Sequence, residues 1–69
     1  MLAKKSFTIA RHRTSVALEP EFWAVLEAEA AKHALSLSAL VARIDGERGT
    51  QALASALRLR ALAAARAAP

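Results

Sequence analysis

The stretch from Arg13 to Trp23, RTSVALEPEFW, changes its hydrophobic period part-way along, and this change constrains the fold more than any other feature. As far as Leu18, two sets of residues alternate, which is the period of a strand with one buried face. The inward set is Thr14, Val16 and Leu18, and the outward set is Arg13, Ser15 and Ala17. From Pro20 onward the apolar residues recur at helical spacing. The sequence therefore predicts a strand over 13–18 that leads directly into a helix.

Three helices are expected after this strand, over 20–33, 36–45 and 50–66. Pro20 suits the first turn of a helix, Ser36 is a good N-cap, and Thr50 can cap the third helix. The leucines of the third helix point in opposite directions, with Leu53 and Leu57 on one side and Leu59 and Leu62 on the other. The fold class expected is mainly α with one short strand.

The residues before the strand are harder to interpret. Residues 1–5 resemble a basic, disordered arm. Phe7 and Ile9 have the opposite parity to Val16 and Leu18, so the buried face switches near residues 10–12. A bulge, a bend or two separate extended pieces would each produce this switch. The role of residues 7–10 stays open.

A chain of 69 residues forms one domain, 1–69, with a core that contributes little stability. Such domains are usually reinforced by disulfides, a metal or oligomerisation. The chain has no cysteine, and its two histidines, His12 and His33, are far apart without a neighbouring carboxylate cluster. Neither a metal nor another cofactor is expected, which leaves oligomerisation.

The charges are segregated along the sequence. Residues 1–18 carry +4, residues 19–47 carry −4, and residues 48–69 carry +4. A basic leading segment favours a polyanionic partner, most often nucleic acid. On charge alone, a solvated basic arm is an equally good interpretation.

A lone strand leaves its backbone N–H and C=O groups unpaired, and the same strand of a second copy is the nearest partner. Two copies pairing antiparallel form a ribbon, and a two-stranded ribbon fits the DNA major groove. We therefore expect an obligate homodimer. The residues predicted to form its shared core are Thr14, Val16, Leu18, Trp23, Leu40, Val41 and Ile44.

The segment SVALEPEFWAVLEAEAAKHALSLSALVARI resembles the ribbon-helix-helix family of bacterial and phage transcription repressors, the MetJ/Arc superfamily. The resemblance covers about Arg13 to Ile44. The following segment, DGERGTQALASALRLRAL, is similar to a compact subgroup with an added C-terminal helix. The family usually has Gly at the position of Ala34, where a left-handed residue with a Cβ costs of order 1 kcal/mol.

The resemblance implies roles for particular residues. The outward strand residues contact bases, here Arg13, Ser15 and Ala17, although Ala17 can only touch a thymine methyl. The N-terminus of the second helix, here Ser36, Leu37 and Ser38, anchors a phosphate through its backbone N–H groups. Further phosphate contacts are expected from the basic residues Lys4, Lys5 and Arg11.

The function expected is that of a bacterial, cytoplasmic, sequence-specific DNA-binding homodimer that represses transcription. Two alternatives stay open: an antitoxin that also holds a toxin or another protein through its C-terminal helix, and a dimeric interaction module without specific DNA binding. Assembly beyond a dimer on DNA is also open. An enzyme is not expected, because the sequence has no nucleophile and base pair, carboxylate pair or phosphate-binding loop. No segment is long and apolar enough to suggest a membrane partner.

Overall fold

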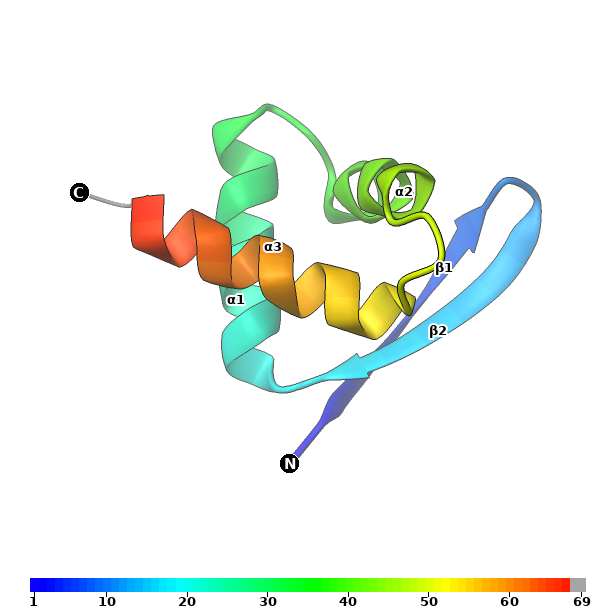
Figure 1. Cartoon of the computed structure of the whole chain (residues 1–69), viewed down its shortest axis with the longest axis horizontal. Helices are drawn as coiled ribbons and strands as arrows, with labels where there is room; N and C mark the ends of the chain where they lie inside the picture. Colours follow the sequence, from blue (N-terminus) through cyan, green and yellow to red (C-terminus); the bar gives the residue numbers. More distant parts are fainter. Residues whose placement is uncertain (68–69) are drawn as a thin grey trace.

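The computed structural model describes residues 1–67, in which a β-hairpin is followed by three helices (Figure 1). The elements are β1 (Ala3–Ile9), β2 (His12–Leu18), α1 (Pro20–Lys32), α2 (Leu37–Glu47) and α3 (Leu53–Ala67). In Figure 1, α3 crosses α1, and the turn of the hairpin lies at the end farthest from these two helices. One face of the hairpin is therefore covered by helices while its tip projects.

The prediction of a single strand without a partner in its own chain is wrong. β1 pairs antiparallel with β2 along its whole length, from Ala3 opposite Leu18 to Ile9 opposite His12. Residues 3–5, predicted to belong to a disordered arm, are thus part of a strand. Of the three explanations for the parity switch, two separate extended pieces is the correct one. The inward residues have odd numbers in β1 and even numbers in β2.

The hairpin turn consists of Ala10 and Arg11, and both residues have positive φ, 52° and 69°. Two positive φ values are typical of the tight turn whose twist matches that of the flanking strands. Asn and Gly normally occupy such turns, because a left-handed residue with a Cβ costs about 1 to 2 kcal/mol. The hairpin therefore closes at the expense of backbone strain.

The helices start and end for identifiable local reasons. Pro20 occupies the first turn of α1, and the Oγ of Ser36 accepts a hydrogen bond from the backbone N–H of Ala39 at 3.0 Å, which caps α2. α3 begins at Leu53 rather than at the predicted Thr50. Two hydrogen bonds of Arg48 explain this later start. The Arg48 carbonyl accepts from the Gln51 N–H at 3.1 Å, and the Arg48 guanidinium donates to the Gln51 carbonyl at 2.7 Å. These bonds hold residues 48–51 in a turn.

The core lies between the inner face of the hairpin and the three helices. Its largest fully buried side chains are Leu18, Leu26, Leu40, Leu57 and Val41. Of the residues predicted to form a core shared by two copies, Thr14 is half-buried and the other six are buried within one chain. One chain thus supplies much of the burial that was predicted to require a dimer.

Candidate nucleic-acid interface

The face of the hairpin that points away from the helices carries polar and basic side chains. We call these residues the outer face: Lys4, Ser6, Thr8, Arg13, Ser15 and Ala17. Ala17 is half-buried and the others are exposed. They alternate with the inward residues Phe7, Val16 and Leu18, which are buried in the core. Burial of the inward set fixes the register, and the register orients the outer face.

The outer face consists of three cross-strand pairs. Lys4 lies opposite Ala17, Ser6 opposite Ser15, and Thr8 opposite Arg13. The two serine hydroxyls are 2.7 Å apart, and Arg13 Nη1 donates a long hydrogen bond of 3.5 Å to Thr8 Oγ1. A guanidinium has five N–H donors, so this single contact leaves most of the Arg13 fork available to another acceptor.

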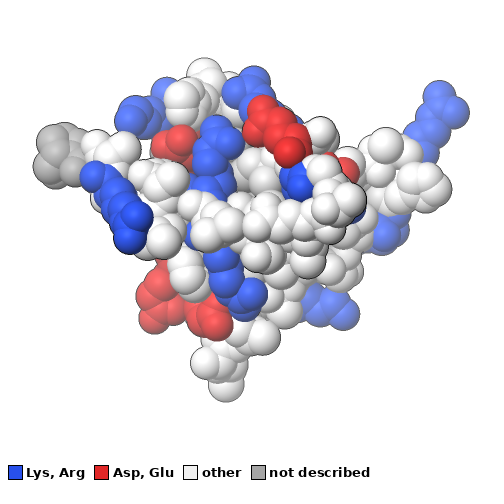
Figure 2. All heavy atoms as spheres, viewed as in Figure 1, with Lys and Arg blue, Asp and Glu red and all other residues white. Residues whose placement is uncertain are grey.

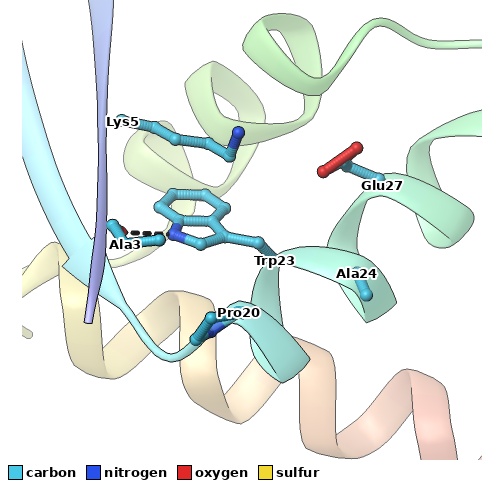
Figure 3. Close-up of a pocket in the computed structure, with 6 residues that line it drawn as sticks. All are labelled: Ala3, Lys5, Pro20, Trp23, Ala24 and Glu27. Carbon is cyan, nitrogen blue, oxygen red and sulfur yellow. Dashed lines mark hydrogen bonds between the residues drawn. The ribbon is translucent and has the colours of Figure 1, made fainter. Parts of the chain in front are cut away.

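Lys5 does not lie on the outer face. Its ammonium nitrogen lies 5.8 Å from the centre of the Trp23 ring, in a pocket that Glu27 also lines (Figure 3). The indole N–H of Trp23 donates to the carbonyl of Ala3 at 2.7 Å. The indole ring thus contacts both the charge and the backbone of β1, and Lys5 braces the strand against α1 rather than pointing outward with Lys4.

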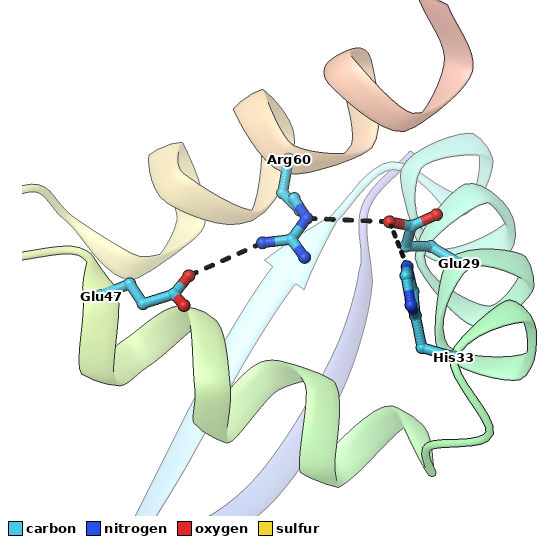
Figure 4. A network of polar contacts seen from close by, with 4 residues as sticks. All are labelled: Glu29, His33, Glu47 and Arg60. Carbon is cyan, nitrogen blue, oxygen red and sulfur yellow. Dashed lines mark hydrogen bonds and ion pairs between the residues drawn. The ribbon is translucent and has the colours of Figure 1, made fainter. Parts of the chain in front are cut away.

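Several charged side chains of the helical part of the chain form ion pairs with one another. Figure 4 shows the Arg60 guanidinium between two carboxylates, 3.9 Å from Glu29 and 3.7 Å from Glu47, and Glu29 also contacts His33 at 3.2 Å. Arg48 pairs with Asp45 and Arg58 with Glu19. Within residues 1–67, no ion pair involves a lysine or arginine of the hairpin.

This difference leaves the hairpin strongly basic. Its four cationic residues, Lys4, Lys5, Arg11 and Arg13, have no Asp or Glu among residues 1–18. Figure 2 shows Lys and Arg on the part of the surface where Figure 1 places the hairpin turn. A basic ribbon with free donors is the kind of surface that a polyanion recognises.

The start of α2 provides a second set of polar groups. Ser36 and Ser38 are exposed and Leu37 is half-buried. The first backbone N–H groups of a helix lack intrahelical partners and lie at the positive end of its dipole. The hydroxyl of Ser36 already accepts the capping bond from Ala39 but keeps its own proton to donate.

In a comparison with protein families, residues 2–65 match a ribbon-helix-helix domain. The chain belongs to the ribbon-helix-helix domain family. Comparison with curated proteins and with solved structures found no match. The ribbon-helix-helix domain is a DNA-binding, non-enzymatic fold, and this membership supports the role of a DNA-binding regulator or of an antitoxin.

Ser6 and Thr8 lie on the ribbon surface but were not predicted as site residues. Their signal was present, because they alternate with Phe7 and Ile9 just as Arg13 and Ser15 alternate with Val16. Recognising it required knowing that residues 3–9 form a strand.

In residues 1–67, no helix of this ribbon-helix-helix protein has the length and hydropathy of a membrane span.

Proposed function

We propose that the protein is a sequence-specific DNA-binding homodimer that represses transcription by occupying an operator. The observation that carries the proposal is the outer face: exposed Arg13 and Ser15 side chains on a two-stranded ribbon whose cations have no acidic partners. A ribbon of two strands fits the major groove, where arginine reads guanine through its O6 and N7 atoms. The Ser15 hydroxyl can donate to or accept from a base edge, and Ala17 contacts a thymine methyl.

Phosphate contacts position the ribbon in this proposal. Arg11, at the exposed tip, and the start of α2 at Ser36, Leu37 and Ser38 are assigned to phosphates, because these groups offer positive charge or free N–H donors without base selectivity. Lys5, which the sequence predicted to contact a phosphate, is not assigned to one here, because its ammonium lies over the Trp23 ring.

Binding to a pool of random duplexes, followed by sequencing of the bound fraction, tests this function. The proposal predicts an enriched site with defined positions. Uniform retention of all sequences would make the protein a non-specific binder. A lack of binding at low salt would favour the interaction module.

The homodimer in this proposal forms by exchange of β1. If the turn at Ala10 and Arg11 opens, β1 of each copy pairs with β2 of the other, and all pairs from Ala3–Leu18 to Ile9–His12 are kept. Both turn residues then leave the left-handed region, which recovers about 1 to 2 kcal/mol for each. Strained, short hinge loops are known to favour such exchange.

Light scattering on a sizing column over a concentration series tests the exchange. The wild type is expected at about twice its 7.3 kDa chain mass. The double variant Ala10→Asn, Arg11→Gly suits the tight turn and should raise the dimer dissociation constant about tenfold or more. Arg11→Ala removes the charge but keeps the strain, so it should match the wild type. Equal dissociation constants for all three would place the dimer contact elsewhere, and a wild-type monomer would refute the dimer.

The antitoxin alternative receives less support. An antitoxin tail that folds on its toxin needs the partner to bury its apolar side chains, whereas α3 buries Leu57 and Ala61 within its own chain. Leu59 and Leu62 on the same helix are 53% and 44% exposed, and they are the residues that such a partner would contact.

A further inference from the structure

β1 contributes half of the ribbon, yet the family resemblance assigns base contacts only to the strand formed here by β2. Lys4, Ser6 and Thr8 of β1 lie opposite Ala17, Ser15 and Arg13. All three are exposed on the outer face. A surface that brings Arg13 and Ser15 to the floor of the groove therefore brings the β1 residues there as well.

This inference rests on the proposed function. We propose that Lys4 and Ser6 contact bases and that Thr8 positions Arg13, so that each two-stranded ribbon of β1 and β2 reads an asymmetric site. Arg13 is the reading cation at the turn end of the ribbon, and Lys4 is the reading cation at the other end. This assigns Lys4 to bases rather than to a phosphate.

The position of Lys4 supports a base contact. Its cross-strand neighbour is Ala17, whose methyl group leaves room for the lysine side chain to extend past it. Lys4 has no ion-pair partner among residues 1–67. An ammonium at the floor of the major groove finds its best acceptors in guanine O6 and N7.

The spacing of the two cations predicts the length of the site. The Lys4–Ala17 pair and the Thr8–Arg13 pair are four residue steps apart along each strand. At about 3.3 Å per residue this is ~13 Å, or about four base pairs along the groove. The expected site has a guanine at each end, read by Arg13 at one end and by Lys4 at the other.

Of the remaining outer-face residues, Ser6 and Ser15 lie between these two ends, and Thr8 lies beside Arg13. The Ser6 and Ser15 hydroxyls share a hydrogen bond of 2.7 Å, which leaves the pair both donor and acceptor capacity. The middle of the site should therefore discriminate less between bases. Thr8 acts as a positioning residue, because its Oγ1 accepts from Arg13 Nη1 and limits where the guanidinium fork can point.

Selection of duplexes by the full-length wild type and by single variants tests this assignment position by position. Lys4→Ala should abolish the preference at one end of the selected site and leave the Arg13 end unchanged. Arg13→Ala should do the reverse. Each should reduce affinity for the selected site about tenfold or more. Lys32→Ala removes one positive charge at an exposed position of α1 and should leave the selected site unchanged.

Thr8→Val keeps the shape of the side chain but removes the acceptor, so the Arg13 end should lose preference, and Thr8→Ser should restore it. An unchanged selected site with Lys4→Ala, together with equal losses on selected and random duplexes, would overturn the role of β1 while leaving the proposed function intact. If the wild type selects no site at all, the proposed function fails first and this inference fails with it.

Discussion

The indole N–H of Trp23 donates a 2.7 Å hydrogen bond to the carbonyl of Ala3, which connects α1 to the start of β1. This contact joins a buried residue of the first helix to the first residue of β1, in the segment 1–5 that was predicted to be a disordered arm. Together with the ammonium of Lys5 over the indole ring, it holds β1 against the body of the protein.

Trp23→Phe should therefore loosen β1 selectively. The variant keeps an aromatic ring beside Phe7, which lies 5.9 Å from Trp23 between ring centroids, but it leaves the Ala3 carbonyl without its donor. Losing such a bond costs about 1 to 3 kcal/mol. Amide hydrogen exchange should accelerate at residues 3–5 more than in α2. Unchanged exchange at the start of β1 would show that this hydrogen bond does not hold the strand.

The turn between α1 and α2 contains a third strained residue. Ala34 has a φ of 57°, and the Leu35 N–H donates to the Ala30 carbonyl at 2.8 Å, as in helix ends that normally use glycine. Ala34→Gly should raise the free energy of unfolding by about 0.5 to 1 kcal/mol, because it removes the Cβ strain. Ala28→Gly, at an exposed helical position, should lower it by a similar amount. Urea denaturation measures both, and a loss of stability in Ala34→Gly would contradict this account of the turn.

Leu40 and Leu62 offer a matched test of packing. Leu40 is fully buried, whereas Leu62 is 44% exposed on α3. Leu40→Ala should cost about 2 to 5 kcal/mol, and Leu62→Ala should change stability by less than about 0.5 kcal/mol. Thermal unfolding at one fixed protein concentration compares them. Similar midpoints for the two variants would mean that α2 does not pack as described.

Glu19 at the start of α1 should make stability depend on pH. A hydrogen bond from its own backbone lowers the pKa of the Glu19 carboxyl below 4.5, Arg58 lowers it further, and partial desolvation opposes both. A lowered pKa stabilises the fold above the ordinary value and loses that contribution as the pH falls. Glu19→Gln should therefore weaken the decline in stability below about pH 4.5, while Glu27→Gln serves as a control on the same helix. Parallel pH profiles for Glu19→Gln and the wild type would contradict this.

The helices could be predicted from local patterns, whereas the hairpin could not. Pro20 and Ser36 are strong local signals for the starts of α1 and α2. The turn of the hairpin lacks such a signal, because neither Ala10 nor Arg11 is a residue that favours positive φ. The parity switch was visible, but without a turn signal it did not distinguish a hairpin from a bulge.

The candidate site residues divide in the same way. The outward positions Arg13, Ser15 and Ala17 follow from strand parity alone. Lys4 and Lys5 are adjacent in sequence and looked equivalent, yet the pairing of β1 sends one to the outer face and the other onto Trp23. That distinction depends on tertiary contacts, which no local pattern encodes.

The central claim is that the outer face of the ribbon reads bases, and Arg13 and Arg11 test it most directly. They carry the same charge two residues apart, Arg13 on the outer face and Arg11 in the turn. The measurement is the affinity of the wild type, Arg13→Ala and Arg11→Ala for a selected duplex and a random duplex across a salt series. Arg13→Ala should weaken the selected duplex by about 1 to 3 kcal/mol more than the random one. Arg11→Ala should weaken binding to both duplexes by the same factor. It should also reduce the slope of log affinity against log salt concentration by about one. If both variants weaken both duplexes equally, the ribbon is not a sequence reader.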